Sequence, residues 1–324
     1  MDRRAFVGAC LSGIAALPLP AAAFAAGAKV KIGFLSWFPP SMKVDLDRFR
    51  EGMRKWAYVD GKDYEVEAYF TAGNAELTRQ LAGKLVQEPV DLLIAIATPA
   101  IHIVKAATQT IPIVMYTANA LATGLVPSLS HPGGNLTGVS LLLTDLAGKR
   151  LDLLKQIRPQ LRKVAFLGST KDPNTKTFVA ETQAGADRLG AILSVRLIDG
   201  PQALDQAMFD AMSRDGSEAV IVQPIFTGYQ DQIVAMATKA RLPVVSDWAV
   251  FAEAGALFTY GAKQAEGVRR LAYYVDRILK GAKPADLPIE QPEEFELVVN
   301  ARTAAALGWM IPKDLLVRAD QVIE

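Results

Sequence analysis

The stretch that decides the fold is Lys31-Ile32-Gly33-Phe34-Leu35-Ser36, because a similar stretch, Lys163-Val164-Ala165-Phe166-Leu167-Gly168, returns near the middle of the chain. Two further segments of the first half return in the same order in the second half. These pairs are Ile94-Ala95-Ile96-Ala97-Thr98-Pro99 with Val220-Ile221-Val222-Gln223-Pro224, and Thr110-Ile111-Pro112-Ile113-Val114 with Arg241-Leu242-Pro243-Val244-Val245. Three echoes in one order indicate that the two halves of the chain fold alike.

Each half alternates short β-rich runs with longer helical patterns. The predicted strands are residues 30–35, 64–69, 92–95, 113–115, 136–139, 164–167, 192–197, 219–222 and 243–245, and the predicted helices are residues 44–58, 75–87, 100–108, 146–157, 175–189, 204–214 and 231–240. Such alternation is typical of parallel sheets with helices on both faces. We therefore predict an α/β fold of two similar doubly wound parallel-sheet lobes, with one large doubly wound sheet as the alternative.

The C-terminal part predicts how the lobes are joined. Its pattern is strand 257–260, helix 264–279 with a stop at Gly281 and Pro284, a proline-containing link at 286–292, strand 295–299 and short helix 303–307. This order suits a chain that crosses between the lobes three times, and a three-crossover hinge can close on a ligand. The predicted lobe 1 is residues 27–141 plus 259–284, and the predicted lobe 2 is residues 142–258 plus 285–324.

The first 26 residues have the pattern of a cleaved export signal. Arg3 and Arg4 precede an apolar run at 6–19, and small residues offer a cleavage site near Ala25 or Ala26. A transmembrane anchor is the alternative, but the run is shorter than the roughly 20 apolar residues that a span needs. The arginine pair resembles a twin-arginine motif, although we expect the general secretory (Sec) route. The mature chain is therefore expected in the periplasm.

Composition excludes several classes of function. The chain is 51% hydrophobic and 21% charged, which excludes intrinsic disorder. Its 35 basic and 34 acidic residues give a net charge of +1, so no basic surface for nucleic acid is expected. One cysteine, Cys10, and two histidines leave little for a metal site. We find no nucleophile elbow, phosphate loop or dinucleotide fingerprint, so we expect no catalytic residue, cofactor or metal, with an unfamiliar α/β enzyme as the remaining alternative.

Candidate binding residues follow from the rule that parallel α/β sheets bind ligands beyond the carboxyl ends of their strands. In lobe 1 these are Ser36, Trp37, Thr98, Pro99, Tyr116, Thr117 and Asn119, and in lobe 2 they are Ser169, Asn174, Gln223, Phe226, Asp247 and Trp248. Hydroxyls and helix N-termini can hold a carboxylate. Asp247 is the candidate counter-charge for an ammonium group, and the aromatic side chains can enclose an apolar ligand body. The simpler alternatives are helix N-caps for Ser36, Ser169 and Asn174, a loop-shaping role for Pro99, and interface packing for Trp37 and Trp248.

Several motifs resemble one family of transport proteins. They include His131-Pro132-Gly133-Gly134-Asn135, Gly148-Lys149-Arg150-Leu151 and Gly281-Ala282-Lys283-Pro284-Ala285-Asp286-Leu287-Pro288. With them the chain resembles the ABC-transporter substrate-binding proteins of the tryptophan/tyrosine type. The resemblance implies a type I periplasmic-binding fold, a ligand between the lobes and delivery to an inner-membrane permease powered by a cytoplasmic ATPase. Thr117-Ala118-Asn119-Ala120 departs from an Asp-Pro-Val-like loop of many relatives, which leaves an amino-acid ligand open.

Together these observations predict a monomeric solute-binding component of an ABC importer. Its lobes would close around a small carboxylate-bearing metabolite, either an aromatic or branched amino acid or a deaminated aromatic acid. The alternative partner is a membrane sensor in place of a permease, since both would read the closed state.

Overall fold

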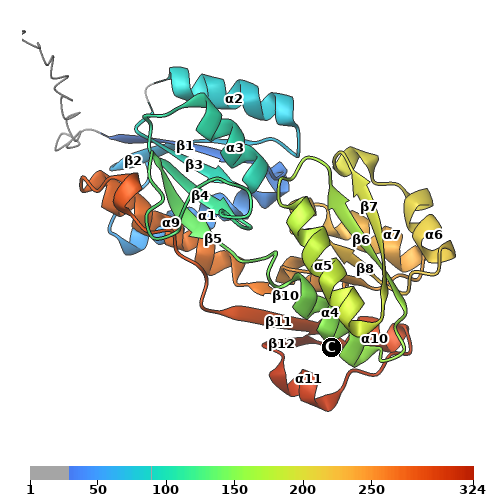
Figure 1. The fold of residues 1–324 in the computed structure, drawn as a ribbon. Coiled ribbons are helices and arrows are strands. Elements are labelled where there is room, and N and C mark those ends of the chain that lie inside the picture. Colours follow the sequence, from blue (N-terminus) through green and yellow to red (C-terminus); the bar gives the residue numbers. More distant parts are fainter. Residues whose placement is uncertain (1–28, 89) are drawn as a thin grey trace, which may run out of the picture.

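The computed structural model describes residues 29–88 and 90–324. The export segment expected at residues 1–26 lies outside the described residues. The described chain forms two lobes, each built on a sheet with helices against both faces (Figure 1). Within the described ranges, no helix is both long enough and apolar enough to cross a membrane.

Lobe 1 contains a five-stranded parallel sheet in the order β2-β1-β3-β4-β5. Its strands are β1 (Val30–Ser36), β2 (Tyr64–Phe70), β3 (Leu92–Ile96), β4 (Ile113–Thr117) and β5 (Leu136–Ser140). Its helices are α1 (Val44–Lys55), α2 (Ala75–Gln87), α3 (Thr98–Ala107) and α9 (Gln264–Leu279). Helices α2 and α3 lie together on one face, while α1 and α9 pack against each other on the opposite face (Figure 1).

Lobe 2 contains a seven-stranded sheet in the order β12-β11-β10-β9-β8-β6-β7. Its strands are β6 (Lys163–Ser169), β7 (Ile192–Ile198), β8 (Val220–Val222), β9 (Val244–Ser246), β10 (Phe258–Ala262), β11 (Phe295–Asn300) and β12 (Gln321–Ile323). Its helices are α4 (Ala147–Ile157), α5 (Thr175–Leu189), α6 (Gln206–Arg214), α7 (Gln230–Lys239), α8 (Ala249–Glu253), α10 (Ala301–Ala306) and α11 (Lys313–Arg318). Strand β11 runs antiparallel to β10, and the other strand pairs are parallel.

The predicted likeness of the halves is confirmed by the strand orders. The series β2-β1-β3-β4-β5 of lobe 1 corresponds to β7-β6-β8-β9-β10 of lobe 2, so the echoed stretches form β1 and β6 in equivalent positions. In both lobes the strand order reverses beside the echoed strand, between β1 and β3 and between β6 and β8. Ligands of open α/β sheets bind at such reversal points, and the two points face each other across the cleft.

The crossovers differ from the predicted boundaries at two places. Strand β10 pairs with β9 and β11 of the second sheet, so the chain returns to lobe 1 after Ala262 and not at residue 259. Residues 285–290 stay with lobe 1, since Ile289 is buried in its core and Glu290 pairs with Val139 of β5. The third crossing therefore falls at 291–294. Both corrections arise because long-range strand pairing, and not the local pattern, assigns a segment to a sheet.

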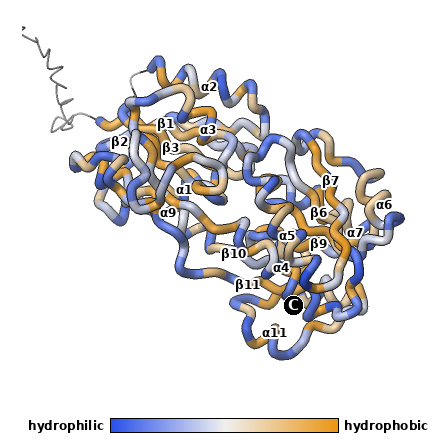
Figure 2. Tube along the Cα trace, viewed as in Figure 1, coloured by the Kyte–Doolittle hydropathy of each residue, from blue (hydrophilic) through white to orange (hydrophobic). Residues whose placement is uncertain are grey.

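The hydrophobic pattern explains the layering. Strands β1, β3, β4 and β5 are almost wholly buried, as expected of a parallel sheet covered on both faces. The chain trace shows apolar residues concentrated along the strands and hydrophilic residues along the outer helices (Figure 2). Helix α9 ends at Leu279 and Gly281 follows with φ of 93°, which confirms the predicted stop. Helices α8 and α11 and strand β12 were not predicted.

Candidate functional site

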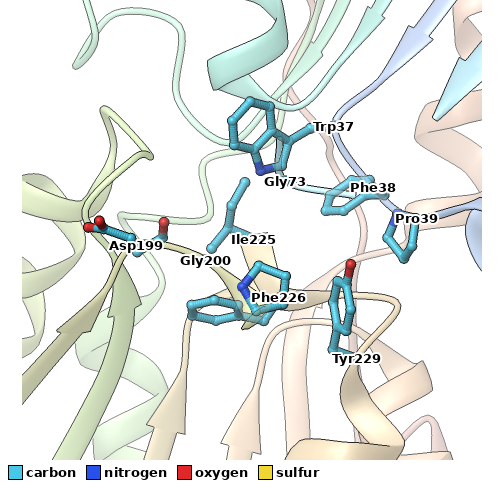
Figure 3. A pocket seen from close by; sticks show the side chains of 11 residues that line it. Trp37, Phe38, Pro39, Gly73, Asp199, Gly200, Ile225, Phe226 and Tyr229 are labelled. Carbon is cyan, nitrogen blue, oxygen red and sulfur yellow. The ribbon is translucent and has the colours of Figure 1, made fainter. Parts of the chain in front are cut away.

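A pocket lies between the lobes, where the two reversal points meet, and we call it the interlobe pocket. Its empty space, counted with the part that is open to solvent, is about 320 Å³. It is lined by Phe38, Ala97, Thr98, Tyr116, Thr117 and Ala118 from lobe 1, Leu141 and Leu143 from the first crossover, and Asp172, Pro224, Ile225 and Trp248 from lobe 2. A second pocket, the rim pocket, shares Phe38 and Ile225 with it. Figure 3 shows the rim pocket, with Trp37, Phe38 and Pro39 of lobe 1 opposite Ile225, Phe226 and Tyr229 of lobe 2.

The lobe 1 side of the interlobe pocket is the start of helix α3. Ala97 connects β3 to this helix with φ of 74°, a left-handed conformation that is costly for a residue other than glycine. The sharp turn places the Thr98 hydroxyl 2.7 Å from the Thr117 hydroxyl at the end of β4. The first amides of a helix have no partner within the helix, and their partial positive charge attracts anions. This side of the pocket is therefore suited to a carboxylate.

The lobe 2 side contains Asp172, a buried carboxylate in the loop between β6 and α5. The Asn174 backbone N–H donates to Oδ1 of Asp172 at 3.0 Å, and Gln223 Nε2 donates to its Oδ2 at 2.7 Å. Gln223 is fixed in turn, because its Oε1 accepts from the Ser169 N–H at 2.9 Å and from the Thr175 hydroxyl at 3.1 Å. The Asp172 side chain is thus held at the pocket by a rigid hydrogen-bond network.

Asp172 accepts hydrogen bonds, but no cationic side chain of the described residues pairs with it. Among the described residues, no ion pair reaches its carboxylate, and its donors are amide groups. Burial raises the pKa of Asp172 from 3.8 to about 6, although the hydrogen bonds from Asn174 and Gln223 lower it in part. A buried carboxylate without a counter-ion is costly. Since Asp172 lines the interlobe pocket, a cationic group of a ligand would supply the missing charge.

Two further polar atoms at the site are buried without a partner among the described residues, Asn174 Oδ1 and Trp248 Nε1. Buried polar atoms in native proteins nearly always have a partner, so unpaired ones beside a pocket indicate groups that a ligand would satisfy. Asn174 Oδ1 adds an acceptor near Asp172, and the Trp248 indole N–H adds a donor. The rings of Phe38 and Trp248 meet edge to face across the lobes, with centroids 5.9 Å apart.

The lobes are in contact at the cleft, so the structure shows a closed arrangement. Asn174 Nδ2 of lobe 2 donates to the Thr98 hydroxyl of lobe 1 at 2.6 Å. At the rim, the Tyr229 hydroxyl donates to the Ala72 carbonyl at 3.4 Å. A Cβ atom on Gly228 would lie only 2.4 Å from Pro39 Cγ, which shows how closely the backbones approach.

Nine of the thirteen predicted residues lie at these pockets or in the network that holds Asp172. Thr98, Tyr116, Thr117 and Trp248 line the interlobe pocket, Trp37, Ser169 and Phe226 line the rim pocket, and Asn174 and Gln223 bind Asp172. The simple N-cap alternative does not describe Asn174, whose side chain makes no capping bond.

Four predicted residues line neither pocket and make no bond to Asp172. The Ser36 hydroxyl accepts from the Phe38 N–H at 3.2 Å and shapes the loop after β1. Pro99 occupies the first turn of α3 and lines neither pocket. Asn119 ties its loop to the first crossover through Thr144, at 2.8 Å.

The fourth, Asp247, predicted as the ammonium counter-charge, already has a cation. Its Oδ1 lies 2.6 Å from Nη1 of Arg150, and both side chains are 1% exposed. Burial raises the pKa of Asp247 to about 7, and Arg150 opposes that rise. Because Asp247 lines neither pocket, the geometry favours Asp172 for the role that the sequence assigned to Asp247.

Eight residues that line the interlobe pocket were not among the predicted ones, namely Phe38, Ala97, Ala118, Leu141, Leu143, Asp172, Pro224 and Ile225. A signal for Asp172 existed, because it lies in the loop at the carboxyl end of β6 beside the predicted Asn174. No local pattern marks Leu141 and Leu143, since they reach the pocket only because the crossover forms part of its wall.

Comparisons with known proteins agree with this fold. The sequence model of the family described as "ABC transporter substrate binding protein" matches residues 35–323. A curated relative, the "Tyrosine-binding protein" of Clostridioides difficile (strain R20291), is 24% identical over 83% of this chain and 77% of its own length. The structure of an ABC domain from Streptococcus pneumoniae in complex with L-Trp is 26% identical, with a TM-score of 0.84 over 91% of this chain and all of that one. A conserved domain protein from Vibrio cholerae gives 25% identity and a TM-score of 0.85 over the same shares.

Proposed function

We propose that this chain, which belongs to the family of ABC transporter substrate-binding proteins, is exported to the periplasm and binds an aromatic amino acid between its lobes. It would then deliver the amino acid to a permease in the inner membrane. A small-molecule ligand and the context of an ABC transporter follow from the family. The class of ligand, the location in the periplasm and the delivery to a permease are our proposal.

The observation that carries the proposal is the pairing of Asp172 with the start of α3 at one pocket. Asn174 Nδ2 lies 2.6 Å from the Thr98 hydroxyl and 3.3 Å from Asp172 Oδ1. The Asp172 carboxylate and the Thr98 hydroxyl at the start of α3 are therefore separated by about one amide group. The ammonium and carboxylate groups of an α-amino acid have a similar separation. The ammonium would bind Asp172 and Asn174 Oδ1. The carboxylate would bind the Thr98 and Thr117 hydroxyls and the N–H groups of Thr98 and Ala100 at the start of α3, since Pro99 between them has no N–H.

The aromatic part of the proposal rests on the pocket walls. Phe38, Tyr116 and Trp248 are aromatic residues that line the interlobe pocket, and aromatic rings gain from edge-to-face or offset contact with one another. Tyrosine for the Clostridioides relative and L-Trp for the Streptococcus domain support the same class of ligand here. The unpaired Trp248 indole N–H can donate to a ligand oxygen.

Binding would act through closure. A ligand that contacts both lobes stabilises the closed arrangement by its differential affinity for that arrangement. The bond from Asn174 to Thr98 and the contact of Phe38 with Trp248 form only when the lobes meet. The closed protein then offers the permease a surface built from both lobes, and no bond of the ligand is made or broken.

The test is a thermal-shift and calorimetric screen of L-tryptophan, L-tyrosine, L-phenylalanine, L-leucine and the deaminated acids 3-indolepropionate and 3-(4-hydroxyphenyl)propionate. A ligand at a hundred times its Kd adds about 2.7 kcal/mol of stability, or about 5 °C in a chain of this size. We expect that rise for at least one aromatic amino acid, with compaction in solution scattering. No rise with any of the amino acids, or tighter binding of the deaminated acids, would overturn the ligand assignment.

The proposed export to the periplasm and the proposed delivery to a permease have separate tests. Osmotic shock of producing cells should release the chain without its first 25 or 26 residues, and retention in the cytoplasm would contradict export. Uptake of the identified amino acid, labelled with ¹⁴C, should fall when the gene is deleted, and unchanged uptake would contradict delivery to a permease.

A further inference from the structure

Arg150 of α4 is a fully buried cation that ligand binding, as proposed above, does not use. Its Nη1 lies 2.6 Å from Asp247 Oδ1 and donates to the Tyr260 carbonyl of β10 at 3.0 Å. Its Nη2 donates to the Leu143 carbonyl at 2.7 Å. Leu143 belongs to the first crossover, and Tyr260 lies shortly before the second. One guanidinium therefore joins the first crossover, at Leu143, to Asp247 and Tyr260 in the body of lobe 2.

The backbone of Leu143 forms hydrogen bonds to both lobes. Its N–H donates to the Ala118 carbonyl of lobe 1 at 3.2 Å, while its carbonyl accepts from Arg150 of lobe 2. Leu141 is tied to lobe 1 in the same way, through the Thr117 carbonyl at 2.9 Å. Between them, Leu142 has φ of 56°, a left-handed conformation that costs roughly 1–2 kcal/mol for a residue with a side chain. The backbone thus makes a sharp, fixed bend where it leaves lobe 1.

The same bend forms part of the ligand pocket. Leu141 and Leu143 line the interlobe pocket, and so do Thr117 and Ala118, whose carbonyls they bind. Asp247 precedes Trp248, which lines the pocket from lobe 2. Arg150 therefore contacts one pocket residue, Leu143, and the neighbour of another, Trp248, although it does not line the pocket itself.

Stability alone does not require a buried ion pair at this place. Replacing such a pair by apolar side chains of similar size is often neutral or stabilising, although removing one partner is strongly destabilising. The guanidinium is also the only donor that the described residues offer to the Leu143 carbonyl.

We propose that Arg150 is the positioning residue of the hinge, which fixes the pivot at Leu143 so that occupancy of the interlobe pocket sets the angle between the lobes. The part that concerns ligand-driven closure rests on the proposed binding function. The part that concerns the pivot itself does not, since it applies to the ligand-free protein as well.

The experiment measures the lobe-to-lobe distance distribution by pulsed dipolar EPR. Spin labels are placed on cysteines introduced at the exposed positions Gln109 of lobe 1 and Lys239 of lobe 2, in a chain with Cys10→Ser. The test variant is Arg150→Met/Asp247→Leu, which leaves no unpaired buried charge. The matched control is Asp152→Asn/Arg188→Met, which removes the pair between α4 and α5, 2.9 Å long and away from the crossovers.

We expect the test variant to broaden the distance distribution of the ligand-free protein, and the control to match the parent chain. We also expect the test variant to weaken the Kd for the amino acid at least tenfold while its pocket residues are unchanged. A folded test variant with the parent's distance distribution and Kd would overturn the proposal, even if its melting temperature fell. If the parent chain binds no amino acid, the proposed function fails, and the ligand-free distance distributions still decide the role of Arg150.

A second variant tests the proposal if the first variant does not fold. Leu142→Gly removes the cost of the left-handed conformation and frees the bend, but leaves Arg150, Asp247 and the residues that line the pocket in place. It should broaden the ligand-free distribution in the same direction. A distribution equal to that of the parent chain would show that the bend at Leu143 does not set the lobe angle.

Discussion

Replacement of Asp172 by asparagine should separate amino-acid binding from protein stability. In the proposed complex the buried carboxylate makes a charge-assisted hydrogen bond to the ligand ammonium, and the asparagine side chain would offer only a neutral amide. Loss of one partner of a buried, hydrogen-bonded charge pair costs about 2–4 kcal/mol, or about 30-fold to 1000-fold in Kd. A deaminated aromatic acid has no ammonium to lose, and its own carboxylate no longer faces a buried negative charge. Its affinity should therefore be unchanged or higher.

The same substitution should stabilise the ligand-free protein. Burial raises the pKa of Asp172 from 3.8 to about 6, so the folded state holds a proton more tightly than the unfolded state does. The resulting penalty is absent below pH 4, grows as the pH rises, and is complete above about pH 6, where it amounts to about 3 kcal/mol. Asparagine avoids this penalty, although its NH₂ group faces Gln223 Nε2, which donates to the carboxylate in the parent chain. We expect a gain of about 1–3 kcal/mol in the free energy of unfolding at pH 7.

The assay is titration calorimetry with L-tryptophan and 3-indolepropionate, alongside urea unfolding of each protein without ligand. Asp199→Asn is the matched control, because Asp199 lies at the rim pocket of the same lobe with a side chain that is 66% exposed. The control should change neither the Kd nor the stability. Equal losses of affinity for the amino acid and the acid in Asp172→Asn would refute the reasoning, and so would unchanged affinity for both.

Three further predictions follow from the same site. Amino-acid affinity should be constant above about pH 7 and fall about tenfold per pH unit well below pH 6, because binding then requires Asp172 to lose a proton; calorimetry from pH 4.5 to 8 checks this, and a flat profile would contradict it. Asn174→Ala should weaken binding about tenfold or more by removing the bond to Thr98 and an ammonium acceptor, and it should reduce the ligand-induced compaction seen in scattering; compaction equal to that of the parent chain would count against it. Trp248→Phe keeps a ring but removes the unpaired indole N–H, so Kd should rise for a ligand that accepts from that N–H, and no change would exclude the contact.

The two-lobed architecture could be predicted because the chain repeats its own pattern. The echo of 31–36 at 163–168 predicted β1 and β6, which occupy equivalent places in their sheets. The lobe boundaries were less accurate, since a strand such as β10 has the same local pattern in either sheet. Its pairing with β9 and β11 is a long-range property that no window of sequence contains.

The sequence predicted which loops form the candidate site more accurately than it predicted what each side chain does there. Strand ends gave Thr98, Thr117, Asn174 and Gln223, because the rule about carboxyl ends needs only the order of strands. The roles depend on which polar groups already have partners. Asp247 has Arg150, whereas Asp172 has only amides, and that contrast arises from packing between segments far apart in the sequence.

The most direct test of the central claim is a crystal structure of the protein with L-tryptophan. We predict the ammonium nitrogen about 3 Å from the Asp172 carboxylate, the ligand carboxylate at the Thr98 hydroxyl and the start of α3, and the indole ring against Phe38 and Trp248. The Arg150–Asp247 pair should be intact in the complex. A ligand whose ammonium binds Asp247 in place of Asp172, or one bound outside the interlobe pocket, would contradict the account.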